Sequence, residues 1–369
     1  MKVSFNRAAL AEALGLVGSV VPARTPKPIL RCVRVCGTEK SATVSATNLE
    51  VGLTCSISAV EVHRQGEVIV EADHLAAIVS QSPDETLVLE LVENNCSVTG
   101  ADSRFTLYCQ DPAHYPKVPG FDGEEAELEV PLDSLQAGIS QCLFATAKES
   151  SRYAINGVLW EFKGKKLLLV ATDGRRLART RVELRGAPSG QLAQQKMIVP
   201  ARTMGLLEKV VSHDKETVAV KLVDNQVLMR CGSVVIGSTL VEGNFPKYED
   251  IIPSDYDKKL TLPTEQVLSA VRRASLLTSE ESKGIKLSIS KDALVVSGSA
   301  PEAGNAEINM MITYKGEPID IGFNPQFLID ALRAMRTPEF ELELGQADRP
   351  GVLKSGADFL YVLMPINLG

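Results

Sequence analysis

The sequence predicts an α+β protein made of three tandem copies of one domain, each with two helices on a mainly antiparallel sheet. The first observation behind this prediction is a repeated segment. Ala171–Ala178 follows the apolar run Leu167–Val170, and its relative Ala46–Glu50 lies 125 residues earlier (171 minus 46). The second is that His114–Lys117 and Asn244–Lys247 resemble each other at a separation of 130 (245 minus 115). A period this long indicates a triplicated domain and not a solenoid.

The predicted first domain, residues 1–126, opens with a strand from Lys2 to Phe5 and an amphipathic helix. Asn6 can cap this helix, in which Leu10, Leu14 and Val17 recur at helical spacing. A proline-containing loop follows, and it cannot be helical because proline lacks the amide proton. The loop contains Pro22, Pro26 and Pro28. After it we predict the strands Ile29–Val35, Ala42–Ala46, Val51–Ile57 and Glu67–Val70, a helix Asp73–Ser80, and the strands Thr86–Leu91, Asn95–Thr99 and Phe105–Cys109.

The predicted second domain, residues 127–256, repeats this order and contains the hairpin that organises the chain. Asp173 and Gly174 supply its turn, because glycine adopts positive φ without steric cost and aspartate tolerates it. The other predicted elements are strand Glu127–Val130, a helix with Leu132, Leu135, Ile139 and Leu143, the strand before Pro200, a helix with Leu206, Leu207, Val210 and Val211, and strands Thr217–Leu222, Val227–Cys231 and Val234–Leu240.

The predicted third domain, residues 257–369, has the clearest helix signal. Asn324 caps this helix and Pro325 takes its first position. Its apolar face consists of Phe327, Leu328, Ala331, Leu332 and Met335. The other predicted elements of this domain are a strand around Leu260–Leu262, a helix that Thr264 can cap and that buries Val267, Leu268, Val271 and Ala274, and a last strand Phe359–Met364.

Composition restricts the class of protein. A chain of 369 residues suits two or three domains, and a net charge of −7 argues against a generally basic nucleic-acid binder, while leaving a local basic surface open. The seven cysteines form no CxxC pair, so we expect reduced and mostly buried thiols. The first residues lead into an amphipathic segment and not into the apolar region of a signal peptide, and no later run approaches the roughly 18 apolar residues of a membrane span, which predicts a soluble cytoplasmic protein.

Catalytic signatures are missing from the sequence. It contains no P-loop, GxGxxG, GxSxG or HExxH motif, and its four histidines are not spaced as metal ligands. The acidic groups Asp255–Asp257 and Glu280–Glu281 lie in polar connecting stretches, where solvated charge is the simpler interpretation. We therefore expect no catalytic residues, no metal and no cofactor.

Basic side chains gather on the later turns of the predicted helices, while several acids complement the helix dipoles in first turns. In an acidic chain this distribution suggests a helical surface that faces phosphate, although merely solvated helix faces explain it equally well. The basic residues are Arg7, Arg202, Lys209, Arg272, Arg273, Arg333 and Arg336, with Arg24, Lys27, Lys148 and Arg152 in loops, and the acids are Glu12, Asp73, Asp133, Glu208, Glu265 and Asp330.

Motifs spread over the whole chain resemble those of bacterial DNA polymerase III β subunits, the sliding clamps. They occur in the family's order and are Arg152–Gly157, Thr172–Leu177, Phe245–Pro246, Ile321–Asn324 and Tyr361–Leu368. The resemblance implies a clamp fold that is not an enzyme, in which a head-to-tail homodimer closes a ring of six domains. Helices would line the hole around duplex DNA, which would be bound without regard to sequence, and the sheets would lie outside.

The resemblance also assigns site residues. It implies partners that include the polymerase III α subunit, the clamp loader and other proteins with clamp-binding motifs, and a cytoplasmic, nucleoid-associated location. It places Arg24, Lys148 and Tyr153 near DNA; a partner-peptide pocket at Arg152, Ile155, Thr172, Gly174, Arg175, Arg176, Leu177, Pro246, Ile251, Val362, Met364, Pro365, Ile366 and Leu368; and the dimer interface at Arg104, Phe105 and Leu107 with Leu276, Leu277 and Glu302.

The chain departs from the family pattern at a few of these places. Arg175 stands where the family often has histidine, Asn367 and Asp102 where basic residues are common, and Gly369 extends past the usual final leucine. The alternative functions are a DNA-independent scaffold, or an enzyme with its site around Asp173. Retention on closed circular DNA that is lost on cutting would distinguish a clamp from a groove binder, which responds to salt but not to topology.

Overall fold

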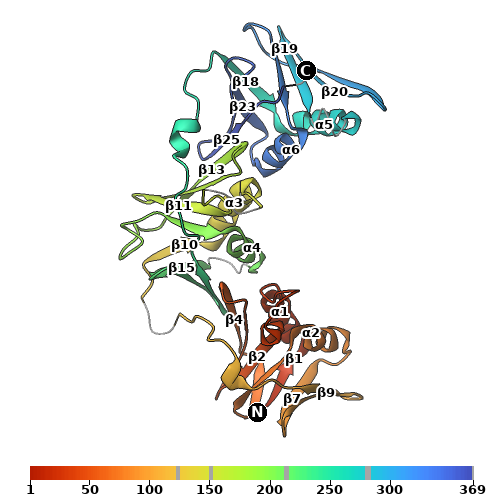
Figure 1. Cartoon of the computed structure of the whole chain (residues 1–369), viewed down its shortest axis with the longest axis vertical. Coiled ribbons are helices and arrows are strands. Elements are labelled where there is room, and N and C mark those ends of the chain that lie inside the picture. Colours follow the sequence, from red (N-terminus) through yellow and green to blue (C-terminus); the bar gives the residue numbers. More distant parts are fainter. Residues whose placement is uncertain (122–124, 149–152, 212–215, 279–283, 368–369) are drawn as a thin grey trace. The chain divides into compact units, whose positions relative to one another are not determined.

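The computed structural model describes residues 1–121, 125–148, 153–211, 216–278 and 284–367, and this part of the chain contains six α-helices and 25 strands (Figure 1). The strands form four sheets, in which every pairing is antiparallel. The chain divides into two compact units. Unit 1 comprises Met1–Asp133, Leu184–Gln195 and Arg202–Leu240, and unit 2 comprises Ser134–Glu183, Lys196–Ala201 and Val241–Gly369.

Unit 1 holds a five-stranded and an eight-stranded sheet. The eight-stranded sheet combines four strands of the predicted first domain with four of the second, and they meet where β4 pairs with β17. The five strands are, in sheet order, β5 (Val60–Arg64), β1 (Lys2–Asn6), β7 (Thr86–Val92), β8 (Asn95–Thr99) and β9 (Arg104–Tyr108); the eight are β10 (Leu128–Pro131), β15 (Thr217–Val223), β16 (Gln226–Cys231), β17 (Val234–Thr239), β4 (Val51–Ile57), β3 (Ala42–Thr47), β2 (Cys32–Gly37) and β6 (Gly66–Glu71).

Unit 2 also contains a sheet that two predicted domains share. Its eight-stranded sheet combines strands of the predicted second and third domains, which meet where β13 pairs with β25. In sheet order its strands are β14 (Met197–Pro200), β11 (Gly157–Lys163), β12 (Lys166–Thr172), β13 (Arg176–Glu183), β25 (Phe359–Leu363), β24 (Gly351–Ser355), β23 (Glu339–Leu344) and β18 (Lys258–Pro263). Unit 2 also holds a four-stranded sheet, in the order β21 (Gly304–Met311), β20 (Ala293–Ala300), β19 (Ile285–Ser290) and β22 (Ile319–Phe323).

The helices are short and each buries one apolar face against the sheets. α1 packs beside α2, and α5 packs beside α6 (Figure 1). As predicted, the Asn6 side chain accepts a hydrogen bond from the Ala9 amide, and Asn324 accepts from Gln326 and Phe327. The six helices are α1 (Arg7–Gly18), α2 (Ala72–Gln81), α3 (Leu132–Cys142), α4 (Ala201–Lys209), α5 (Thr264–Ala274) and α6 (Pro325–Ala334).

Several predicted boundaries are wrong for local reasons. Pro28–Arg31 forms a 3-10 helix, so β2 begins at Cys32; proline is tolerated in a first helical turn, where its amide would have no partner. The Thr264 hydroxyl donates to the Thr337 carbonyl and does not cap α5, whose cap position is Pro263. Helix α4 ends at Lys209, and the exposed Val211 lies beyond it.

Several strands of the structure were not predicted from the sequence, among them β5, β11 and β19 to β24. Their absence from the prediction has a physical reason. Residues 60–64 of β5 are mostly polar and lie at a sheet edge, whereas the first five residues of β11 are all buried and show no alternation of polar and apolar side chains.

The expected burial of the cysteines is confirmed for five of the seven, and all seven are free in the structure. Among the residues that the structure describes, no helix is long and apolar enough to cross a membrane. The same residues contain no group of three or more His, Cys, Asp or Glu side chains that could hold a metal ion.

Candidate functional site

The hairpin between β12 and β13 has a turn that its own polar side chains hold. The Thr172 hydroxyl donates to the Arg176 carbonyl (2.7 Å) and accepts from the Gly174 amide (3.1 Å). One carboxylate oxygen of Asp173 accepts from the amides of Arg175 and Arg176 at 3.0 and 3.1 Å. Gly174 has φ +86°, as predicted for this turn. Four hydrogen bonds therefore fix the backbone before any longer-range contact is made.

The predicted relative of this turn, between β3 and β4, has the same hydrogen bonds. Thr47 donates to the Val51 carbonyl (3.0 Å) and accepts from the Leu49 amide (3.0 Å). Asn48 accepts from the amides of Glu50 and Val51 at 3.1 and 2.7 Å. Leu49 occupies the place of Gly174 with φ +80°, a conformation that costs a non-glycine residue energy. The threonine and the Asn or Asp therefore determine this turn, and the glycine makes it easier to form.

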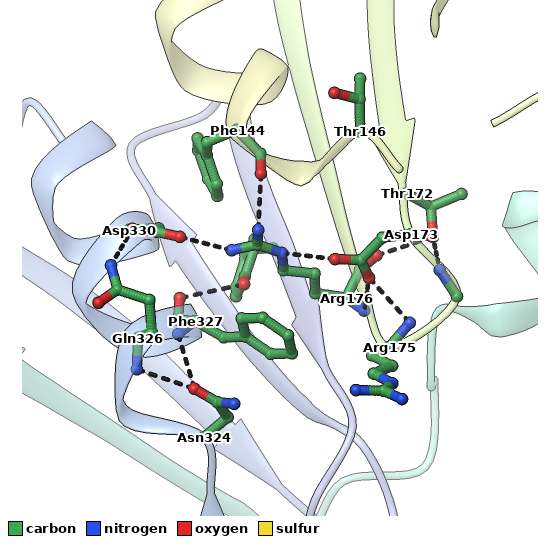
Figure 2. Close-up of polar contacts among 12 residues, drawn as sticks. Phe144, Thr146, Thr172, Asp173, Arg175, Arg176, Asn324, Gln326, Phe327 and Asp330 are labelled. Atoms are coloured by element: carbon green, nitrogen blue, oxygen red, sulfur yellow. Dashed lines mark hydrogen bonds and ion pairs between the residues drawn. The ribbon is translucent and has the colours of Figure 1, made fainter. Parts of the chain in front are cut away.

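Arg176 connects the hairpin to α6 and to the segment that follows α3 (Figure 2). Its guanidinium donates to Asp330 at 2.7 Å, to Asp173 at 2.9 Å and to the Phe144 carbonyl at 2.7 Å. It also lies 4.2 Å from the ring centroid of Phe327 and 5.5 Å from that of Phe144. Burial alone would lower the pKa of Arg176, but the hydrogen bonds to the two aspartates outweigh it and raise the pKa above its usual value.

Beside this network the junction of β13 and β25 is apolar. Leu177 faces Val362 across the strand pair, and both side chains are about 1% exposed within a cluster that includes Tyr248. Ile155 is also buried. The Met364 amide donates to the Arg175 carbonyl (3.0 Å), so the chain beyond β25 stays attached to the turn of the hairpin. An apolar floor thus lies directly under a hydrogen-bonded rim.

The rim of this floor contains the exposed members of the predicted pocket. Ten further predicted pocket residues lie in unit 2: Thr172 and Ile155 are buried, Arg176, Pro246, Pro365 and Ile366 are partly buried, and Gly174, Arg175, Ile251 and Met364 are exposed. The predicted pocket residues Arg152 and Leu368 lie outside the described residues.

Two cavities adjoin the predicted pocket residues in unit 2. One of about 290 Å³ lies between Pro246 and Leu159. Another of about 510 Å³ contacts Pro365 and Ile366. The first is lined by Tyr248, whose hydroxyl donates to the buried Glu161 at 2.5 Å, and by Lys196, which forms an ion pair with the same carboxylate at 2.8 Å. The connecting segment 243–249 is therefore fixed to the sheet by a buried polar pair.

The predicted DNA contacts Arg24, Lys148 and Tyr153 are all exposed, Arg24 in unit 1 and the other two in unit 2. Several of the basic helix residues donate hydrogen bonds to protein groups, among them Arg273 to the Ser269 carbonyl and Arg336 to the Ser140 hydroxyl. Arg202 donates to the carbonyls of Ser19 and Val20 at the end of α1, and Arg7 donates to the Asp84 carbonyl. Arg272, Arg273, Arg333 and Arg336 are exposed on or next to α5 and α6.

The predicted dimer residues lie at two strands that end their sheets within the described residues. Arg104, Phe105 and Leu107 belong to β9, and Leu276 and Leu277 follow α5 beside β20 and β21. Phe105 and Tyr108 on β9 are exposed, as are Leu276 (79%) and Met311 (96%) beside or on β21. Glu302 lies exposed in the turn before β21.

Sequence reasoning missed the partners of Arg176. Phe327 was predicted only as part of an apolar helix face, Asp330 only as one of the acids on helix polar faces, and Phe144 carried no prediction. In the structure Asp330 is the sixth residue of α6, and its carboxylate pairs with Arg176 instead. The only local indication was Asp173, three residues before Arg176, with the apolar Leu177 and Ala178 after it.

Comparisons with known proteins cover the whole chain. Profiles of the DNA polymerase III β subunit match residues 1–119 (N-terminal domain), 129–247 (central domain) and 249–367 (C-terminal domain). The β sliding clamp of Caulobacter vibrioides is 30% identical over 377 residues, and that of Vibrio cholerae is 27% identical over 371; both alignments cover 100% of each chain. The sliding clamp of Bartonella birtlesii, solved with griselimycin bound, superposes with a TM-score of 0.92 at 32% identity over 100% of this chain and 99% of that one.

Proposed function

We propose that this chain, which belongs to the DNA polymerase III β-subunit family, tethers polymerases and other replication and repair proteins to duplex DNA as a closed head-to-tail dimer. Its family makes it a DNA sliding clamp, a processivity factor without catalytic activity. The finer assignments, to DNA, to a partner pocket and to a dimer interface, are proposals. So are a location in the cytoplasm on the nucleoid and the domain boundaries 1–126, 127–256 and 257–369.

The proposed dimer is supported by the way in which sheets of neighbouring domains join inside the chain, where the end strand of one pairs with the end strand of the next. β17 ends the order β10-β15-β16-β17 and pairs with β4, which ends β6-β2-β3-β4. β25 and β13 pair in the same way. Among the sheet ends of the described residues, β9 and β21 stand in the equivalent place, each last in a run of three consecutive strands (β7-β8-β9 and β19-β20-β21), as β4, β13, β17 and β25 are. Pairing β9 of one chain with β21 of another continues the rule, and such head-to-tail contacts can close a ring.

Apolar side chains support this pairing. Gly298 on β20 has no Cβ, and a Cβ there would lie 2.3 Å from the Ala274 carbonyl oxygen, so the end of α5 packs directly on the sheet. This contact presents Leu276 beside β21, where it and Met311 are exposed apolar side chains on one edge of the sheet. We infer that it fits against Phe105 and Leu107 of the second chain.

Leu276→Ala combined with Leu277→Ala tests the interface. Truncating a leucine that an interface buries costs roughly 2–5 kcal/mol, so the variant should sediment as a monomer. Val211→Ala, which removes an exposed apolar side chain elsewhere, is the control and should remain dimeric. An intact dimer of the leucine variant would remove these residues from the interface.

Binding of DNA is proposed to be electrostatic and independent of sequence, because the chain has basic side chains but no base-reading motif. Arg24→Ala and Lys148→Ala should each reduce the salt slope of DNA binding by about one unit. Lys165→Ala, in the exposed turn between β11 and β12, is a matched control of equal charge. Retention on closed circular DNA, and loss of the protein when that DNA is cut, separates a clamp from a DNA-independent scaffold.

The junction of β13 and β25 is proposed to dock short peptides from the polymerase III α subunit, the clamp loader and other proteins with clamp-binding motifs. Its apolar floor and hydrogen-bonding rim suit two apolar anchors, which give micromolar affinity after ordering costs. The alternative of an enzyme around Asp173 has little support, because both oxygens of that carboxylate already hold the turn and Arg176.

Calorimetry with a peptide that contains Gln and Leu or Phe tests the docking site. Leu177→Asp should abolish binding and leave the dimer intact. Since Leu177 is buried and its replacement also destabilises the junction, Met364→Ala provides a second variant on the exposed rim, expected to weaken binding about tenfold. Undiminished heat from both variants would rule out the assigned pocket.

A further inference from the structure

The first helices of the three predicted domains, α1, α3 and α5, end in equivalent ways. Ser19 after α1 corresponds to Phe144 after α3 at the repeat distance of 125 (144 minus 19), and Phe144 corresponds to Leu276 after α5, since 276 minus 144 and 264 minus 132 are both 132. In the first two copies the carbonyl of this residue accepts a hydrogen bond from a guanidinium. Arg202 donates to Ser19 at 3.0 Å, and Arg176 donates to Phe144 at 2.7 Å (Figure 2). Within the described residues no hydrogen bond reaches the carbonyl of Leu276, whose side chain is 79% exposed.

The second helix of the next domain supplies or supports each of these donors. In unit 1, Arg202 is the second residue of α4. In unit 2, the ring of Phe327, the third residue of α6, lies 4.2 Å from the guanidinium of Arg176. At both places, therefore, the first turn of a second helix faces the end of a first helix. The second helix that remains is α2 and the helix end that remains is Leu276, so in the proposed head-to-tail dimer α2 of one chain meets the end of α5 of the other.

A cavity of about 730 Å³ in unit 1, which we call the α2 groove, borders this helix. Its walls include His74, Ala77 and Ile78 of α2, together with Leu107 and Tyr108 of β9. The three α2 residues are the third, sixth and seventh of the helix, and the residues at the same three positions of α4 are all buried. In α2, by contrast, the side chain of His74 is 67% exposed. The α2 groove therefore has an uncovered helix face beside the strand that is proposed to pair with β21 of a second chain.

The ring of His74 has one nitrogen engaged. Its Nδ1 lies 3.0 Å from one carboxylate oxygen of Glu71, whose other oxygen pairs with Arg31 at 2.6 Å. Because a carboxylate only accepts hydrogen bonds, Nδ1 carries a proton there, and a neutral ring then has only a lone pair at Nε2. The described residues offer Nε2 no hydrogen bond. A hydrogen bond from Nε2 to a carbonyl oxygen therefore needs a second proton, which makes the ring a cation.

The charges around the α2 groove favour this cation. The titratable and charged groups of its own chain there are Glu71, Asp73, Arg31, Cys32 and Tyr108. Two carboxylates and one guanidinium leave one negative charge, and burial raises the pKa of Cys32 to about 11, so that this thiol stays neutral. The described charged groups of the second chain next to Leu276 and β21 are Arg272, Arg273, Glu302 and Glu307. Their charges cancel, and the C-terminal end of α5 adds the partial negative charge that stabilises a nearby cation.

We propose that the α2 groove seats Leu276 of a second chain and that protonated His74 donates to the carbonyl of that leucine, so that the dimer takes up protons as it forms. This inference rests on the proposed dimer. A closed head-to-tail dimer has two identical interfaces, so two protons accompany each dimer. The dimer is therefore tightest at a pH where His74 is charged, and it weakens as the pH rises and the ring loses its second proton.

The test measures the dissociation constant of the dimer at about pH 6 and about pH 8 by sedimentation with fluorescence detection. In the parent this constant should be about tenfold larger at the higher pH, since a cation at a helix end acts at both interfaces. His74→Gln should have the weaker constant at both pH values, and His74→Lys, which keeps its charge, the tighter one. His114→Gln is the matched control: His114 also pairs with an acid three residues before it, Asp111 at 3.6 Å, but it lies outside the α2 groove, so this variant should keep the parent's pH dependence.

A second measurement follows the ring itself by NMR. The imidazole signals of His74 should titrate at a higher pH in the parent dimer than in the Leu276→Ala, Leu277→Ala monomer, and equal midpoints overturn the inference. So does a parent dimer whose dissociation constant is the same at both pH values, or a His74→Gln variant that keeps the parent's pH dependence. A parent protein that is monomeric at both pH values overturns the proposed dimer itself, and that result is distinct from the other three.

Discussion

Replacing Arg176 by methionine should destabilise the hairpin of unit 2 by about 3 kcal/mol. The side chain is only 10% exposed and gives up three hydrogen bonds of 2.7 to 2.9 Å together with its stacking on Phe327. Removing one partner of a buried ion pair costs about 3–5 kcal/mol, because the remaining charge stays buried. The lower end applies here, since Asp330 is 19% exposed and keeps its hydrogen bond from Gln326.

Amide exchange of β13 measures this loss better than global unfolding, because a chain of several domains does not unfold in two states. A change of about 3 kcal/mol corresponds to roughly 100-fold faster exchange. Arg181→Met is the matched control on the same strand: its ion pair with Asp358 spans 3.7 Å and is half exposed, so the change should stay within about 0.5 kcal/mol. Equal exchange in both variants would show that the buried network does not hold the hairpin.

Three further predictions concern single side chains. Leu49→Gly should stabilise unit 1 by about 1 kcal/mol in thermal melts, because Leu49 has φ +80° and is half exposed; an unchanged or lower melting temperature would contradict this. Burial would raise the pKa of Glu161, but hydrogen bonds from Lys196 and Tyr248 lower this pKa below its usual value of 4.5. The stability that the Glu161 carboxylate contributes to the fold is therefore present above pH 4.5 and is lost as the pH falls through the lowered pKa. The stability difference between Glu161→Gln and the parent should accordingly shrink in acid, and a constant difference would refute the ion pair's role. Burial raises the pKa of Cys55 and of Cys96 to about 12, so mass spectrometry after alkylation at pH 8 should find both thiols unmodified in the folded protein.

Local chemistry explains which parts of the fold could be predicted from the sequence. The hairpin at Asp173 and Gly174, the cap at Asn324 and the apolar faces of the helices depend on neighbours within a few residues, and the structure has them apart from the ends of α3 and α4. The repeat of the hairpin at residues 46–51 was visible for the same reason, because Thr47 and Asn48 carry the turn even where leucine replaces glycine.

Contacts between distant residues could not be predicted in this way. Nothing near Arg176 in the sequence indicates Asp330, which is 154 residues away, and nothing near Gly52 indicates Pro119. The burial of Leu177 is of the same kind, since it depends on the segment around Tyr248. Periodicity reports which side of an element is apolar, but it does not report which element covers that side.

The repeat makes these distant contacts comparable, and the comparison accounts for how one fold can carry several functions. At β4–β17, β13–β25 and the free strands β9 and β21, the same kind of strand end meets another strand or is left unpaired. The junctions differ in their side chains: a glycine pair, Gly52 and Gly237, lies against Pro119, a leucine and valine pair is buried in a cluster with Tyr248, and Phe105, Leu276 and Met311 on or beside β9 and β21 are exposed. Because the backbone hydrogen bonds are common to the first two junctions, substitutions at the paired positions should change what a junction binds without changing the fold.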